Sequence, residues 1–359
     1  MPESTAGELG SLFWGAEPRT GQPWTRGHIQ TLLVREPNHL VSKRLRRFFT
    51  LAREGMNTKI SPVEKLEFEG IVFSDPRYKK SSEAVKDFRL ILSWAVSGAF
   101  GGGEPGNPYT QRAQEGIRAW VHTCQPDGNP INQNHFIPLL CAIDLAHSTL
   151  NSEVQTRTGE WLGKILLLGD QHFESKKSTA TILVNNHRTW HLAVRGIVAR
   201  MMKNKDEIQK TRELFDSHAM KNLNADGTSF DFFQRDALHY HVYNLEAYVY
   251  YLILTKKNLS AEAQEHVFRA LGLLKSYFLG EKQHLEFVKT TVKFDITRKE
   301  ANDSHFQNKP WEPQRARKLL RLSHLLYKEK SDFSGWTRSV IDENYDPFIK
   351  LLTALHGGE

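Results

Sequence analysis

Two short stretches of this chain combine side chains that bind carboxylates with side chains that move protons. In the first, Asn185, Asn186 and His187 stand where a helix-forming pattern begins, and the indole of Trp190 follows one turn later. An amide and an imidazole can both donate hydrogen bonds to carboxylate oxygens. This stretch is therefore a candidate binding site for an acidic group.

The second stretch follows further along the chain and adds a cation and phenols. It contains Gln234, Arg235, His239, Tyr240, His241 and Tyr243. Arginine neutralises a carboxylate in fork geometry, and tyrosine can transfer a proton. Together the two stretches hold the groups needed for elimination across a uronic-acid glycoside, and we interpret them as one active site.

This elimination requires a neutralised carboxylate on C5, a base for the C5 proton and an acid for the departing O4. Asn186 and His187, with Arg235 as the cation, suit the first task, and Tyr240 suits the proton transfers. The ordinary tyrosine pKa of about 10 must be lowered by positive charge, from Arg235 or His241, for a base at neutral pH. The predicted substrate-binding neighbours are Asn185, Trp190, Gln234, His239, His241 and Tyr243.

The same residues resemble a known family. The Asn-Asn-His-x-x-Trp block at 185–190, the arginine, and the Leu-x-Tyr-His-x-Tyr block at 238–243 resemble the alginate lyases of polysaccharide lyase families five and thirty-eight. The segment 138–145 is similar to a helix of those enzymes, with Ile143 in place of an aromatic residue. The resemblance, over roughly residues 110–260, implies a helical toroid that cleaves alginate without a cofactor or metal.

For mannuronate, the C5 proton and the leaving oxygen lie on the same side of the sugar. The resemblance then implies that Tyr240 serves as both base and acid. For guluronate they lie on opposite sides, and His187 would be the base with Tyr240 as the acid. Sequence alone leaves both epimers open, and also the endo or exo mode of cleavage.

The spacing of Arg235 departs from the family. The family-five arginine lies seven residues before the tyrosine, on one helical face, whereas Arg235 lies five before Tyr240. Five residues rotate a regular helix by about 140°. Either the helix begins after Arg235 and the side chain reaches in from a loop, or another residue carries the charge.

Other chemistries are open to these residues. Asp231 and Asp236 form a possible carboxylate pair for glycoside hydrolysis on a helical barrel. His187 and His191 have the spacing of a zinc-protease helix, but Arg188 stands where such a site needs glutamate. A polyglucuronate or other uronate lyase, and a polyanion-binding protein without enzymatic activity, remain as alternatives.

Composition and net charge limit the classes of molecule that this protein is expected to bind. The 359 residues carry a net charge of +7, with 39% apolar and 25% charged residues, which favours an acidic polymer as partner. Charge alone does not choose among nucleic acid, an anionic membrane and an acidic polysaccharide, and from the two chemical stretches we expect the polysaccharide and neither of the others. No apolar run reaches the roughly 18 residues of a spanning helix. No signal peptide pattern is visible, so we expect a cytoplasmic protein, or a secreted or periplasmic one if a leader was removed. Cys124 and Cys141 lie in apolar patterns typical of buried thiols.

Helical periodicity dominates from about residue 78 onward. It predicts an all-α protein: a single (α/α)n toroid or barrel of antiparallel helical hairpins with a cleft. Residues 1–77, with Trp14 and Trp24, are predicted to form an arm packed on the body or a lid, and 78–359 the catalytic domain. The glycine-rich segment 98–109 suggests a functional loop. Strand-like alternation occurs only at 60–76 and 285–296.

Overall fold

The computed structural model describes residues 40–100, 107–340, 348 and 352. The predicted arm residues Trp14 and Trp24, and positions 101–106 of the glycine-rich loop, lie outside these described residues. The chain divides into two compact units. Unit 1 comprises residues 1–175, 194–208 and 345–359, and unit 2 comprises 176–193 and 209–344. The predicted domain boundary at residue 77 stays a prediction.

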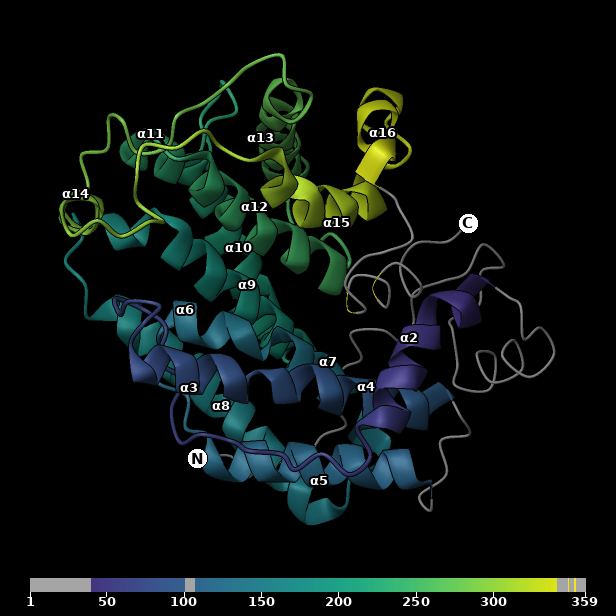
Figure 1. Ribbon diagram of the computed structural model, residues 1–359. Coiled ribbons are helices and arrows are strands. Elements are labelled where there is room, and N and C mark those ends of the chain that lie inside the picture. Colours follow the sequence, from purple (N-terminus) through teal and green to yellow (C-terminus); the bar gives the residue numbers. More distant parts are fainter. Residues whose placement is uncertain (1–39, 101–106, 341–347, 349–351, 353–359) are drawn as a thin grey trace. The chain divides into compact units, whose positions relative to one another are not determined.

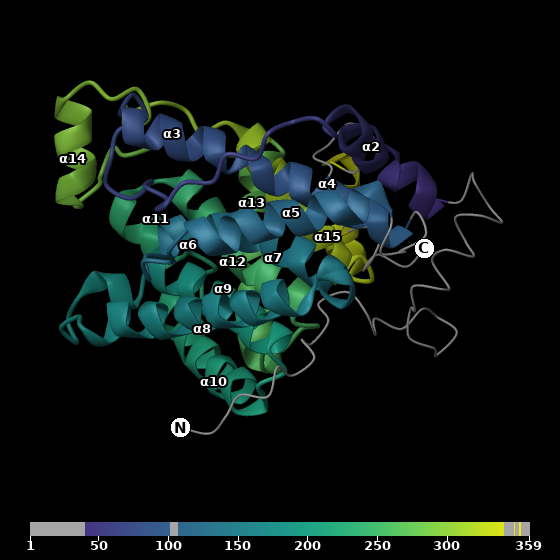
Figure 2. The same cartoon turned by 90° about the horizontal axis from the view of Figure 1, so that it is seen from below.

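Unit 1 is built from helices that pack around α4, as Figures 1 and 2 show for α4 and α5. Its helices are α2 (Leu40–Glu54), α3 (Pro76–Ala84), α4 (Lys86–Phe100), α5 (Pro108–Thr123), α6 (Pro130–Gln133), α7 (Ile137–Ala146) and α8 (Ser152–Glu174). Three fully buried indoles form its core, Trp94, Trp120 and Trp161. Each indole N–H finds an acceptor, the last one the Cys124 carbonyl at 2.9 Å, so the aromatic core leaves no indole donor unpaired.

Both cysteines belong to this core. Cys124 and Cys141 are fully buried and not disulfide-bonded. Burial raises the pKa of Cys124 to about 12 and that of Cys141 well above its ordinary value. The prediction of buried structural thiols is confirmed, because a buried neutral thiol is a poor nucleophile.

Two helices contribute residues to both units, α9 (Asn186–Met201) and α10 (Lys205–Asn222). The remaining helices of unit 2 are α11 (Phe230–Arg235), α12 (Leu238–Leu254), α13 (Ala261–Phe278), α14 (Lys293–Glu300), α15 (Arg317–Tyr327) and α16 (Ser331–Thr337). Helix α12 is buried along nearly its whole length and packs against α11, α13 and α15 (Figure 1). Ser260 caps α13, since its Oγ accepts the Ala263 N–H at 3.2 Å.

The described residues form no β-strand, only two isolated bridges. The strand-like alternation at 285–296 becomes a loop followed by α14, and that at 60–76 becomes a loop that leads into α3. The all-α prediction is therefore confirmed for the described part of the chain. No helix within that part is long and apolar enough to cross a membrane.

Candidate active site

The first predicted stretch lies at the start of α9, in unit 2. Asn185 caps the helix, because its Oδ1 accepts the His187 N–H at 3.0 Å. Asn186 is fully buried, and its backbone N–H donates to Asp231 Oδ2 at 2.8 Å while its side-chain amide donates to Oδ1. His187 is half-buried. One carboxylate from α11 thus fixes the first turn of α9.

Asp231 is a buried acid in this arrangement. Burial raises its pKa to about 6, although hydrogen bonds from Asn186 and the charge of Arg235 act in the opposite direction. Among the described residues, Asn186 Oδ1 is buried without a hydrogen-bond partner. The structure thus shows Asn186 as a support for Asp231, and its contact with a substrate carboxylate stays a prediction.

Trp190 and Tyr243 pack on each other. Their ring centroids lie 5.2 Å apart, and Trp190 is 3% exposed. Tyr243 is half-buried. Trp190 is therefore a core residue in this structure, and its contact with substrate stays a prediction.

A buried polar network behind α9 escaped the sequence analysis. Thr189 Oγ1 donates to Asn244 Oδ1 at 2.6 Å and lies 2.8 Å from His218 Nε2, and Asn244 Nδ2 donates to Asn222 at 2.7 Å. Asn222 in turn donates to the Val184 carbonyl. Burial lowers the pKa of His218 to about 3, so this imidazole is neutral. The network joins the start of α9 to α10 and α12.

The second stretch is divided by a break between two helices. Helix α11 ends at Arg235, Asp236 has the left-handed φ of 50°, Ala237 is extended, and α12 begins at Leu238. The guanidinium carbon of Arg235 lies 3.6 Å from the centroid of the Tyr240 ring. The first of the two alternatives for the spacing is correct in that the tyrosine helix begins after Arg235, but Arg235 lies at the end of α11 and not in a loop.

Arg235 is also held by a carboxylate. Its Nε donates to Asp295 Oδ2 at 3.0 Å and its Nη2 to Oδ1, and Thr290 Oγ1 donates to Oδ2 at 2.9 Å. Asp295 has no exposed side-chain surface. Sequence analysis missed it because one acidic residue in the first turn of α14 forms no local pattern with residues of α11. The pair leaves the Nη1 donors of Arg235 for other contacts.

Tyr240 is half-buried and packs against Phe287 and the small cluster of Ala237 and Phe306. Burial raises its pKa to about 12, Arg235 lowers it, and nearby carboxylates raise it again. The lowered pKa that the sequence analysis required is therefore absent in this state. The charge of Arg235 lowers the pKa of Tyr240 as expected, but burial raises that pKa by more.

His241 has a structural role, and it does not lower the pKa of Tyr240 as predicted; its contact with substrate stays a prediction. It is fully buried, with Nδ1 2.9 Å from Ser229 Oγ and Nε2 3.0 Å from the Ala270 carbonyl. Burial lowers its pKa to about 4, so it is neutral near pH 7. Both nitrogens are occupied, and the imidazole ties α12 to α13.

The neighbours of Tyr240 have separate anchors. His239 Nδ1 lies 2.5 Å from Glu286 Oε2, and its ring centroid lies 4.3 Å from that of Tyr240. The Gln234 carbonyl accepts the Thr291 N–H at 3.2 Å. Substrate contacts of His239, Gln234 and Asn185 stay predictions.

The paired-carboxylate alternative loses support from this geometry. Asp231 is engaged by Asn186, and Asp236 Oδ2 accepts the Lys289 N–H at 2.7 Å. Both carboxylates therefore accept hydrogen bonds from backbone N–H groups of unit 2. Among the described residues, no three His, Cys, Asp or Glu side chains are grouped to hold a metal.

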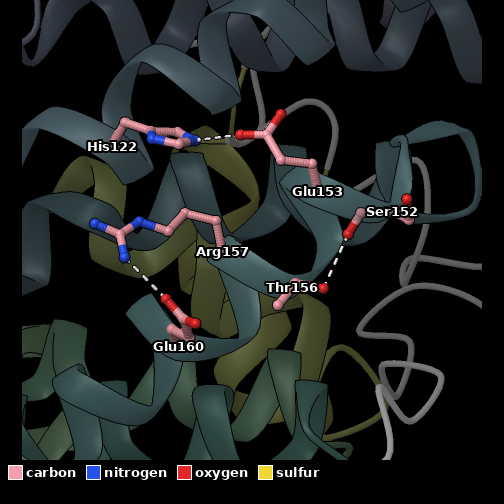
Figure 3. A pocket seen from close by; sticks show the side chains of 6 residues that line it. All are labelled: His122, Ser152, Glu153, Thr156, Arg157 and Glu160. Atoms are coloured by element: carbon pink, nitrogen blue, oxygen red, sulfur yellow. Dashed lines mark hydrogen bonds and ion pairs between the residues drawn. The ribbon is translucent and has the colours of Figure 1, made fainter.

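A surface pocket occurs in unit 1, between α5 and α8 (Figure 3). His122 Nε2 lies 3.0 Å from Glu153 Oε1, and Arg157 donates to Glu160 at 2.8 Å. These charges satisfy one another, and none of the predicted site residues lines the pocket. The candidate active site is the group of residues in unit 2.

Comparisons with known proteins identify the family and the fold. The family model described as alginate lyase matches residues 76–284. No curated protein matches the chain. Solved structures do: a histidine-to-alanine variant of alginate lyase A1-III complexed with a tetrasaccharide has 14% identity and a TM-score of 0.57, covering 92% of this chain and 93% of that chain.

Two further structures of that protein are similar. The apo form of the same variant has 15% identity and a TM-score of 0.54, with 91% of this chain and 93% of that chain covered. Alginate lyase A1-III from Sphingomonas species A1 has 16% identity and a TM-score of 0.52, with 92% and 94% covered. At this identity the likeness shows the fold, and it confirms the predicted fold class, the α/α toroid.

The buried His241 predicts how stability varies with pH. Its pKa is lowered from 6.5 to about 4. Between pH 6.5 and about 4, His241 binds a proton in the unfolded chain but stays neutral in the folded chain. The free energy of unfolding therefore decreases as pH falls, by up to about 3 kcal/mol. Urea unfolding of His241→Gln should show a smaller loss over the same pH range. A loss equal to that of the wild type would contradict the assignment.

Proposed function

The chain belongs to the alginate lyase family and is a polysaccharide lyase, and we propose that it cleaves an acidic polyuronate by β-elimination without a cofactor. Alginate rich in mannuronate is the proposed substrate. The observation that carries the mechanism is the stacking of the Arg235 cation on the ring of Tyr240, 3.6 Å from its centroid. A phenol beside a fixed cation suits proton transfer at the carbon next to a carboxylate.

In the proposed reaction, Tyr240 takes the C5 proton as its phenolate. The electrons left on C5 delocalise into the carboxylate and then form the C4–C5 double bond as the bond to O4 breaks. The Tyr240 hydroxyl returns the proton to O4. Since the pKa of Tyr240 is about 12 in the free protein, the phenolate is a strong base but a rare form at neutral pH.

The carboxylate needs donors that strengthen as its charge grows. We assign this task to His187 and Asn186 at the start of α9, with the free Nη1 donors of Arg235 as the third group. Support comes from the anchoring of each: Asp231 fixes the first turn of α9, and Asp295 fixes Arg235. Prearranged donors do not have to reorganise during the reaction.

The first test is the nature of the product. Incubation with polymannuronate, polyguluronate and polyglucuronate should shorten the chains and produce the ultraviolet absorbance of a conjugated C4–C5 double bond, with polymannuronate fastest. New reducing ends without that absorbance would instead identify a hydrolase. Binding without chain shortening would identify a polyanion-binding protein.

A second test removes one hydroxyl. Tyr240→Phe should lower kcat by about 10²–10⁴-fold, the contribution of a positioned acid or base, and leave KM nearly unchanged. Tyr277→Phe on α13 is the matched control, since Tyr277 is also half-buried, and it should keep the wild-type kcat. Loss of activity in Tyr243→Phe with retention in Tyr240→Phe would show that the other tyrosine of α12 is catalytic.

A further inference from the structure

Arg235 and Asp295 form a buried ion pair beside Tyr240. The Arg235 side chain is 12% exposed and that of Asp295 is 0% exposed. One edge of the guanidinium, made by Nε and Nη2, donates to the two carboxylate oxygens, so the plane of the cation is fixed by the carboxylate. The position of the cation over the phenol ring therefore depends on Asp295.

The segment that carries Asp295 is itself fastened to the end of α11. The Phe287 N–H donates to the Asp236 carbonyl at 2.7 Å, and the Lys289 N–H donates to the Asp236 side chain at 2.7 Å. Thr291 donates to the Gln234 carbonyl through both N–H and Oγ1. These bonds come immediately before and after Arg235 in the chain. The segment 287–295 is therefore hydrogen-bonded to the chain at the break between α11 and α12.

Two effects of Asp295 on Tyr240 oppose each other. Its own negative charge raises the pKa of Tyr240, whereas the Arg235 cation that it holds in place lowers it. Removal of the Asp295 charge alone would therefore favour the phenolate. Displacement of Arg235 from the ring would disfavour it. The sign of the change in activity reveals which effect dominates.

We propose that Asp295 is a positioning residue of this enzyme: it holds the Arg235 guanidinium on the face of the Tyr240 ring and acts on the reaction through that contact. The proposal rests on the function proposed above. It assigns part of the proton-transfer site to α14, which carries no residue of either predicted stretch. Thr290, which donates to the same carboxylate, completes the anchor.

A double-mutant cycle tests the coupling. Asp295→Asn preserves the shape of the side chain and removes its charge, and it should lower kcat about 10–100-fold with little change in KM. In the Arg235→Met background the same substitution should change kcat by less than about twofold, because it acts only through the arginine. An equal loss in both backgrounds, or a rise in kcat for Asp295→Asn, would overturn the proposal.

The control residue, Asp303, lies just after α14. Asp303 pairs with Arg298 of α14 at 3.9 Å and shares no contact with Arg235 or Tyr240. Asp303→Asn therefore removes an acidic partner next to α14 without touching the anchor, and it should keep kcat within about twofold of the wild type. A loss as large as that of Asp295→Asn would show that α14 merely needs to be folded.

A second readout needs no catalysis. The guanidinium carbon of Arg235 lies 3.6 Å from the centroid of the Tyr240 ring, so in a nitrogen-labelled protein the ring current should shift the proton resonance of the adjoining Nε–H upfield. Arg235→Met identifies the signal by its absence. The upfield shift should persist in Asp303→Asn and be lost in Asp295→Asn. An unchanged shift in Asp295→Asn would refute the positioning role.

The two readouts separate the two proposals. If the wild type forms no unsaturated product but the resonance moves as expected, the lyase mechanism fails and the anchor stands. If the wild type forms the unsaturated product but the Arg235 resonance does not move in Asp295→Asn, the proposed role of Asp295 is wrong and the lyase mechanism is not. Should Asp295→Asn not fold, Thr290→Val is measured in the same ways, with a smaller change expected in the same direction.

Discussion

The site depends on one electrostatic contact, the cation of Arg235 against the face of the Tyr240 ring. A continuous helix through residues 230–245 would turn these side chains away from each other, since five positions rotate it by about 140°. The left-handed residue Asp236 breaks that helix, a conformation that aspartate tolerates better than most residues. The break converts an unfavourable spacing into a stacked pair.

The other contacts that fix the site residues follow from burial. A charge removed from water must be paired, and a buried polar group must find a hydrogen-bond partner. Arg235 is paired by Asp295, the N-terminal turn of α9 by Asp231, and His239 by Glu286. These acids fix the donors before substrate arrives. The net charge of +7 suits a polyanionic substrate but does not specify this arrangement.

Sequence patterns correctly predicted the features that depend on interactions between residues close in the chain. Helical periodicity and the buried cysteines depend on neighbours within a few turns, and the structure agrees with both predictions. His241 was misassigned because its partners, Ser229 and the Ala270 carbonyl, lie on other elements. Asp295 and Glu286 were missed for the same reason. They reach the site through packing between distant segments, which no spacing in one sequence encodes.

The most direct measurement is a crystal structure of Tyr240→Phe with a bound mannuronate oligosaccharide. We expect the ring at position 240 to face both C5 and O4 of one glycosidic linkage from the same side. We also expect Arg235 to stay stacked on the ring while His187 contacts the carboxylate of that sugar. An oligosaccharide bound with its scissile linkage away from position 240, or with Asp231 and Asp236 flanking that linkage, would contradict the account.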